Sequence, residues 1–154
     1  MNIQGLEFPD HLFYAPPLGL WLREELDGQL TLGLNAYGCA LYGEIFAFTP
    51  KRIGAHIPEG RSFGLMEFAK AATSSRSPLS GELTAVNAQL DRRPALIHRD
   101  CYGEGWLVRL RPDNWPIQRQ HLPQGEAARA ALEEQMRLDG FDPHNPAVQA
   151  LKWK

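Results

Sequence analysis

The sequence predicts a mainly β domain, a sandwich or flattened barrel of short strands. Between residues 20 and 110, short apolar segments recur, and residues typical of turns separate them. The chain has 154 residues, of which 44% are hydrophobic. It is therefore long enough for one domain with a real core and too short for two ordinary domains.

The first predicted strands form a hairpin. Residues 20–24 and 29–34 flank Asp27 and Gly28. A glycine supplies the positive φ that tight hairpin turns require. We therefore expect these two segments to pair.

A short helix and a further strand are expected next. Asn35 can cap a helix that runs through Leu41, although Gly38 weakens it. Residues 45–48 are apolar, and Pro50 follows them as a stop signal for a strand.

A lysine at a predicted turn is the most informative single residue. Residues 63–69 and 79–86 are predicted to pair as the two strands of a hairpin, with the polar residues 73–78 as a turn-rich linker between them. Lys70 lies where the first strand gives way to this turn. A lysine there is either a solvated turn residue or, because its amine sits on a flexible stem, a site of acylation.

The last predicted elements of the strand region follow this lysine. Asn87 can cap a short helix through Arg92, which Pro94 ends. Residues 106–110 read Trp-Leu-Val-Arg-Leu and are expected to close the set of strands.

A longer amphipathic helix is predicted near the C-terminus. In residues 125–139, Ala128, Leu132 and Met136 share one face, and Gly140 is a stop signal.

Two interpretations of the C-terminal segment stay open. Residues 145–153 predict a short terminal helix that contains Trp153. We divide the chain into a domain of residues 1–111 and a helical extension, residues 112–154, packed on it. The extension either completes the core or offers a docking surface to a partner, with Trp153 as an anchor.

Composition and charge exclude several classes of function. The net charge of −2 and the scattered arginines give no basic stripe, so we expect no nucleic-acid partner. No apolar run approaches the roughly 20 residues of a membrane helix, and the first residues lack a signal-peptide pattern. We expect a cytoplasmic protein without a membrane partner, and a monomer.

Several motifs, in order and at matching spacing, carry a resemblance to a known family. The chain resembles the H protein of the glycine cleavage system and its lipoyl-carrier relatives from Phe8 to about Arg111. Family members typically read E-S-V-K-A, P-V-S-G-E, V-N-x-x-L, P-x-L and Y-G-E-G-W-L. The corresponding segments here are residues 67–71 (Glu-Phe-Ala-Lys-Ala), 78–82 (Pro-Leu-Ser-Gly-Glu), 86–90 (Val-Asn-Ala-Gln-Leu), 94–96 (Pro-Ala-Leu) and 102–107 (Tyr-Gly-Glu-Gly-Trp-Leu).

The resemblance implies a fold, a cofactor and a role. The fold is the barrel-sandwich hybrid of lipoyl and biotinyl domains, and the cofactor is lipoic acid, joined as an amide to Lys70. Glu67 and Gly81 match positions associated with recognition by the attaching enzyme. The protein would be a carrier with a swinging arm and no catalytic residues, because tethering brings the cargo to each partner's active site.

The resemblance also implies partners. A lipoate-protein ligase or lipoyl-transfer enzyme would modify the lysine, and dihydrolipoamide dehydrogenase would reoxidise the arm. Other partners depend on the pathway, which is either glycine cleavage, with an aminomethyl cargo, or bacterial sulfur oxidation, with a heterodisulfide-reductase-like complex.

Departures from the family pattern favour sulfur oxidation slightly. Residues 19–21 read Gly-Leu-Trp where H-E-W is typical, and Ser74 and Ala36 stand where acidic residues are common. Met66 and Phe68 add bulk near the arm. Fewer acidic groups weaken the case for an amine-bearing cargo, since amines favour acidic or hydrogen-bonding neighbours.

The remaining reactive residues suggest no further site. Cys39 and Cys101 are far apart in the sequence and lack a Cys-x-x-Cys motif, so two buried or half-buried thiols are expected. A thiol enzyme using either cysteine, a biotin carrier and an unmodified binding module stay as alternatives. The histidines show no metal-like pairing and are expected at surface or capping positions: His11, His56, His98, His121 and His144.

Overall fold

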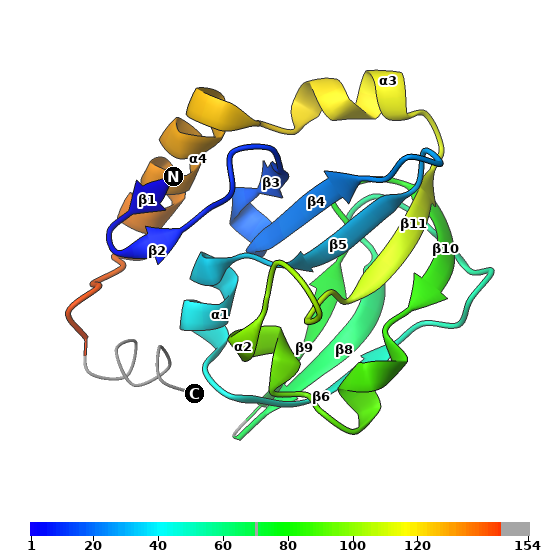
Figure 1. Cartoon of the computed structure of the whole chain (residues 1–154), viewed down its shortest axis with the longest axis horizontal. Coiled ribbons are helices and arrows are strands. Elements are labelled where there is room, and N and C mark those ends of the chain that lie inside the picture. Colours follow the sequence, from blue (N-terminus) through cyan, green and yellow to red (C-terminus); the bar gives the residue numbers. More distant parts are fainter. Residues whose placement is uncertain (70, 146–154) are drawn as a thin grey trace.

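The computed structural model describes residues 1–69 and 71–145 (Figure 1). Lys70 lies outside the described residues. So do residues 146–154, which include Trp153 and almost all of the expected terminal helix.

Three antiparallel sheets form the framework of the described residues, so the mainly β prediction is confirmed. The largest sheet has the order β3 (Phe13–Ala15), β4 (Leu20–Glu24), β5 (Leu30–Leu34), β11 (Val108–Pro112), β10 (Gly81–Val86), β7 (His56–Ile57). A second sheet contains β6 (Ile45–Pro50), β8 (Ser62–Phe68) and β9 (Ala71–Arg76), and a small one pairs β1 (Asn2–Ile3) with β2 (Leu6–Glu7).

Short helices connect these strands, and one longer helix follows them. The α-helices are α1 (Ala36–Tyr42), α2 (Leu96–Arg99), α3 (Trp115–Gln118) and α4 (Gly125–Asp139). Single turns of 3-10 helix occur at Pro16–Leu18, Ala88–Asp91 and Arg119–His121. The sequence predicted α1, Ala88–Asp91 and α4, but not α2 or α3.

Local signals set the first hairpin and its neighbours. β4 and β5 pair along their whole length, from Leu20 opposite Leu34 to Glu24 opposite Leu30. At the turn, Gly28 has a φ of 85°, as predicted for a hairpin glycine.

Two asparagines cap the helices that the sequence assigned to them. The side chain of Asn35 accepts a hydrogen bond from the backbone N–H of Gly38 at the start of α1. Asn87 does the same for Gln89. Gly38 also has a packing role, because a Cβ there would lie 2.4 Å from the carbonyl oxygen of Gly19.

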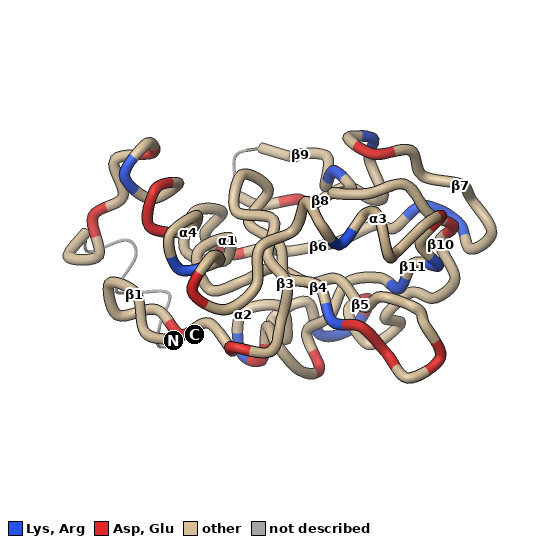
Figure 2. The backbone as a smooth tube through the Cα atoms, turned by 90° about the horizontal axis from the view of Figure 1, so that it is seen from above, with Lys and Arg blue, Asp and Glu red and all other residues tan. Residues whose placement is uncertain are grey.

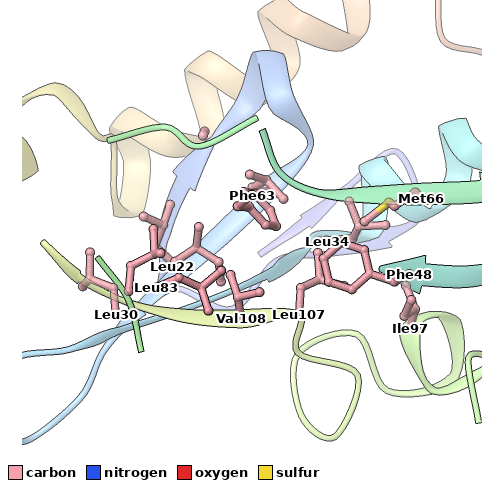
Figure 3. Close-up of a cluster of buried hydrophobic side chains, with 14 of the residues drawn as sticks. Leu22, Leu30, Leu34, Phe48, Phe63, Met66, Leu83, Ile97, Leu107 and Val108 are labelled. Carbon is pink, nitrogen blue, oxygen red and sulfur yellow. The ribbon is translucent and has the colours of Figure 1, made fainter. Parts of the chain in front are cut away.

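The main core lies between the two larger sheets. Figure 3 shows side chains from β8 and from the six-stranded sheet directed into one interior, among them Phe63, Met66 and Leu34. All three are 1% exposed or less. Burial on this scale gives the sheets their main attraction, because apolar surface contributes about 25 cal/mol for each Å² removed from water.

One strand contradicts the sequence prediction. Residues 73–78 were expected to form a turn-rich linker, and residues 79–86 were expected to pair with the strand before Lys70. Instead β9, which contains most of this linker, pairs with β8, and β10 lies in the other sheet. Threonine favours strands, and strand pairing depends on neighbouring residues more than on intrinsic preference.

A second core joins the two ends of the described chain. Ala128, Leu132 and Met136 of α4 are buried against a cluster that includes Ile3, Trp21 and residues between them in sequence. Figure 1 shows α4 beside the β1–β2 hairpin. α4 ends at Gly140, which has a φ of 66°, so the predicted helix and its stop signal are confirmed.

Charged residues are spread over the described surface without a stripe of one sign (Figure 2). In residues 1–69 and 71–145, no helix combines the length and hydropathy that a membrane span requires.

We predict that Leu132→Ala lowers the free energy of unfolding by about 2–5 kcal/mol, because it leaves a cavity in the second core. Leu138→Ala is the matched control on the same helix, since Leu138 is 65% exposed. Chemical denaturation of both variants measures the difference. Equal stability of the two would contradict the packing described for α4.

Candidate functional site

Strands β8 and β9 form a hairpin whose last paired residues are Phe68 and Ala71. Only Ala69 and Lys70 connect them. Two residues are the usual length of a tight hairpin connection. Ala69 is exposed. The connection therefore includes the lysine that the sequence singles out.

Aromatic contacts hold the end of this hairpin against the domain. The rings of Phe68 and of Tyr42, the last residue of α1, lie 5.9 Å apart between centroids. Further along β8, the Phe63 ring lies 6.1 Å from that of Phe48 in β6. Gly64 allows this packing, because a Cβ there would lie 2.6 Å from the Phe48 ring. The inner face of the hairpin is thus fixed.

The outer residues of β9 next to the connection are small. Ala71, Ala72 and Ser74 are exposed, whereas Ser75 is buried. An enzyme can therefore approach the connection from this side without displacing bulky side chains. The described residues fit a covalently attached group that extends into solvent.

A cavity of about 160 Å³ lies beside β9. Among the residues that the structure describes, Arg76 is the only charged residue in its lining, and none of them brings a carboxylate. Burial raises the pKa of Tyr42, so its phenol stays neutral. The lining consists of Pro17, Leu18, Leu20, Leu34, Tyr42 and residues 73–76.

Two departures from the family pattern meet at this cavity. Leu20 replaces the typical glutamate of H-E-W, and Ser74 replaces an aspartate; both line the cavity. The third departure, Ala36, does not line it. In the sequence these replacements are far apart, and only the fold brings Leu20 next to Ser74 and Arg76.

The two positions associated with the attaching enzyme lie in different sheets. Glu67 is exposed in β8 and faces Ala47 and Ala72 in the register of the sheet. Gly81 is buried in β10, opposite Ile57 and Pro112. A Cβ on Gly81 would lie 2.6 Å from the carbonyl oxygen of Arg111. Gly81 therefore has a structural role in strand pairing, whereas Glu67 is available at the surface.

Other motif residues that carried the resemblance maintain the scaffold. The Asn87 amide donates hydrogen bonds to the carbonyl oxygens of Glu104 and Trp106, at 2.7 and 2.8 Å. Gly105 packs so tightly that a Cβ would lie 2.2 Å from the carbonyl oxygen of Leu96. These contacts tie the segment before β11 to the segments after β10.

The histidines show no common site. Within residues 1–69 and 71–145, no three histidine, cysteine or acidic side chains are grouped so that they could hold a metal ion. His98 Nε2 accepts a hydrogen bond from the backbone N–H of Ile45 at 2.9 Å, and His56 Nε2 lies 2.8 Å from a carboxylate oxygen of Asp113.

The two cysteines are neighbours in space, which sequence spacing did not indicate. Cys39 is buried and Cys101 is half-buried, as expected, and both are free thiols. A hydrogen bond with Cys101 and burial raise the pKa of the Cys39 thiol well above its ordinary value.

The model of the glycine cleavage H-protein family matches residues 12–135. The chain belongs to this family. Proteins of this family are non-catalytic carriers with lipoate covalently attached to a lysine, which confirms the predictions of a carrier and of its cofactor. The match continues past Arg111 into α4.

Curated relatives carry the same family name. Glycine cleavage system H protein 5 of Aquifex aeolicus is 35% identical over 73% of this chain and 78% of its own length. H protein 2 of the same organism is 32% identical over 97% of this chain and 92% of its own length. The H protein of Chromobacterium violaceum is 37% identical over 61% of this chain and 73% of its own length.

A solved structure supports the fold. The crystal structure of a glycine cleavage system H protein from Mycobacterium marinum superposes with a TM-score of 0.67, at 22% sequence identity. It covers 87% of this chain and all of its own. The expected barrel-sandwich hybrid of lipoyl domains is therefore confirmed.

We predict that Gly81→Ala lowers the free energy of unfolding by about 1–3 kcal/mol, because the added methyl group overpacks the contact between β10 and β11. Glu67→Ala should change it by less than about 0.5 kcal/mol, since the Glu67 side chain is exposed. Urea denaturation of both variants tests the contrast. If Gly81→Ala has the same free energy of unfolding as the wild-type protein, the close contact with Arg111 does not contribute to stability.

Proposed function

We propose that Lys70 carries the lipoyl group of this carrier. The observation that supports this most directly is the β8–β9 hairpin, whose two-residue connection contains Lys70. The sequence has three other lysines, Lys51, Lys152 and Lys154. Of these, Lys51 follows β6, and its backbone N–H donates to the carbonyl oxygen of Phe63, outside any tight hairpin connection.

The folded residues and the cofactor divide the work. When attached, the lipoyl group supplies a dithiol that takes up and releases cargo. The protein supplies the rigid support: Phe68 against Tyr42 fixes the hairpin end, and Ala71, Ala72 and Ser74 keep its outer side accessible. Tethering raises the effective concentration of the cargo at each partner enzyme.

Recognition by the attaching enzyme is assigned to Glu67 and Gly81 in different ways. Glu67 is exposed one strand position before the end of β8, so its carboxylate can contact the enzyme directly. Gly81 is buried, so we propose that it acts by keeping β10 in register.

We propose the aminomethyl group of glycine cleavage as the cargo. Relatives from Aquifex aeolicus and Chromobacterium violaceum are named glycine cleavage system H proteins, and the one with the widest coverage spans 97% of this chain. The slight preference for sulfur oxidation drawn from the sequence has no counterpart in these names. The partners would be the glycine cleavage enzymes, dihydrolipoamide dehydrogenase and a lipoate ligase or lipoyl-transfer enzyme.

One observation keeps the sulfur cargo as the second candidate. The cavity beside β9 has Leu20 and Ser74 where the family typically has acidic residues, and Arg76 carries the one charge among its described lining residues. A guanidinium favours an anionic cargo over a protonated amine. The partner in this case would be a heterodisulfide-reductase-like complex.

The remaining proposals concern the setting of the protein. We propose that the protein is cytoplasmic. We also propose that it is a monomer, because a carrier that meets several enzymes must leave its surface free for them. We also retain the division into a carrier domain, residues 1–111, and an extension, residues 112–154. The burial of Ala128, Leu132 and Met136 supports packing of the extension as its main role.

We predict that the chain gains the mass of one lipoyl group when it is co-expressed with a suitable lipoate ligase. Lys70→Arg should abolish the gain, because arginine offers no amine that can form the amide. Lys51→Arg is the matched control and should leave the gain intact. Intact-protein mass spectrometry measures all three. A lipoyl group on Lys70→Arg protein would place the attachment elsewhere.

The cargo is decided by offering the lipoylated protein to glycine decarboxylase and, in parallel, to a heterodisulfide-reductase-like complex. We predict glycine-dependent loading, measured as a mass increase that requires glycine. Ser74→Asp should speed this loading, because a carboxylate in the cavity favours an amine. Loading only by the sulfur complex, with no acceleration by Ser74→Asp, would select the second candidate.

A further inference from the structure

Two hydrogen bonds bring α1 and the segment around Cys101 together. The Cys39 thiol donates to the carbonyl oxygen of Ile97 at 3.4 Å. At the start of the same helix, the backbone N–H of Ala36 donates to the Tyr102 hydroxyl at 2.9 Å. Ile97 and Tyr102 lie on either side of Cys101 in the sequence, so these contacts hold Cys101 next to Cys39.

The two cysteines share one core. Cys101 lies close enough to raise the pKa of the Cys39 thiol, together with burial. Both residues belong to the cluster between the large sheets, with Cys39 buried inside it and Cys101 packed at its margin. A third contact fixes the backbone here, because the Trp21 indole N–H donates to the carbonyl oxygen of Cys101 at 2.8 Å.

The thiols differ in access to solvent. Cys101 is half-buried in a series of turns, residues 101–105, so small molecules can reach it. Cys39 is 9% exposed, and its thiol faces the backbone of Ile97 in α2. An attacking thiolate must reach a disulfide sulfur, so Cys101 reacts first and Cys39 second.

We propose that Cys39 and Cys101 form a redox modification site, which low-molecular-weight disulfides oxidise to an intramolecular disulfide. The Cys101 thiolate attacks the small disulfide, forms a mixed disulfide and expels one small thiolate. The Cys39 thiol then gives up its proton and attacks the Cys101 sulfur, which expels the second small thiolate. The two cysteine protons end on the two released thiols, so the protein loses two electrons and the small disulfide gains them.

Oxidation at this site would act on the hairpin support. The new bond joins α1 to the segment that follows α2. α1 carries Tyr42, whose ring contacts Phe68 at the end of β8. The inference does not depend on the lipoyl arm, because neither cysteine belongs to the β8–β9 hairpin.

The test uses the full chain with Lys70→Arg, which keeps any lipoyl dithiol out of the reaction. The folded protein is incubated with oxidised glutathione and analysed by intact mass and by non-reducing peptide mapping. We expect the loss of two hydrogen atoms, a peptide linked between Cys39 and Cys101, and full reversal by dithiothreitol.

Two single variants separate the steps. Cys39→Ala should keep one glutathione on Cys101, because the resolving thiol is gone. Cys101→Ala should neither gain glutathione nor lose hydrogen, because the remaining thiol is buried. If Cys39→Ala does not fold, Cys101→Ala alone tests which cysteine reacts first. If the protein with both cysteines retains a glutathione adduct or stays fully reduced, the proposal is wrong.

Discussion

Packing between β8 and the leucines of the six-stranded sheet is the interaction on which the rest of the structure depends. The side chains of Phe63 and Met66 point from the three-stranded sheet into the core, where Leu22, Leu30 and Leu34 of the six-stranded sheet also lie (Figure 3). This contact joins the two sheets into one body. It also fixes the direction in which β8 leaves the core, and so the position of the strand ends on either side of the two-residue connection. A carrier with no catalytic residues needs little else from its fold than a firm base for its arm.

The sequence predicted the features that depend on nearby residues. Gly28 in the first hairpin, Asn35 and Asn87 as caps, and the apolar face of α4 all act within a few residues, and the structure confirms them. β9 was missed because its partner cannot be read from Ala, Thr and Ser alone: pairing with β8 is decided by which surface is free in the assembled sheet. Gly81 illustrates another limit. Its match to the family pattern predicts a role in recognition, which stays a prediction. The nearby carbonyl oxygen of Arg111 adds a packing requirement that no local pattern contains.

The candidate site likewise combines residues that are close in the sequence with residues that only the fold brings together. Glu67 and Lys70 are adjacent to one hairpin end, so the family motif identified them together. Four separate stretches of the sequence line the cavity beside β9, and only the fold shows that Leu20 shares it with Ser74 and Arg76. Family membership therefore bears on the role of the protein as a carrier, and the chemistry of the cavity bears on its cargo. Membership establishes a lipoyl carrier, whereas the side chains around this cavity bear on the proposed cargo.

The second core has a consequence for how the protein is made. Ile3 and Leu6, near the start of the chain, are buried with Leu132 and Met136 of α4. A ribosome delivers residues from the N-terminus onward, and structure forms as segments emerge. Part of the apolar surface of the first strands therefore stays uncovered until α4 has been synthesised. The sheets around β5 and β11 can assemble earlier, which makes the β1–β2 hairpin, although first in sequence, among the last parts of the fold to be completed.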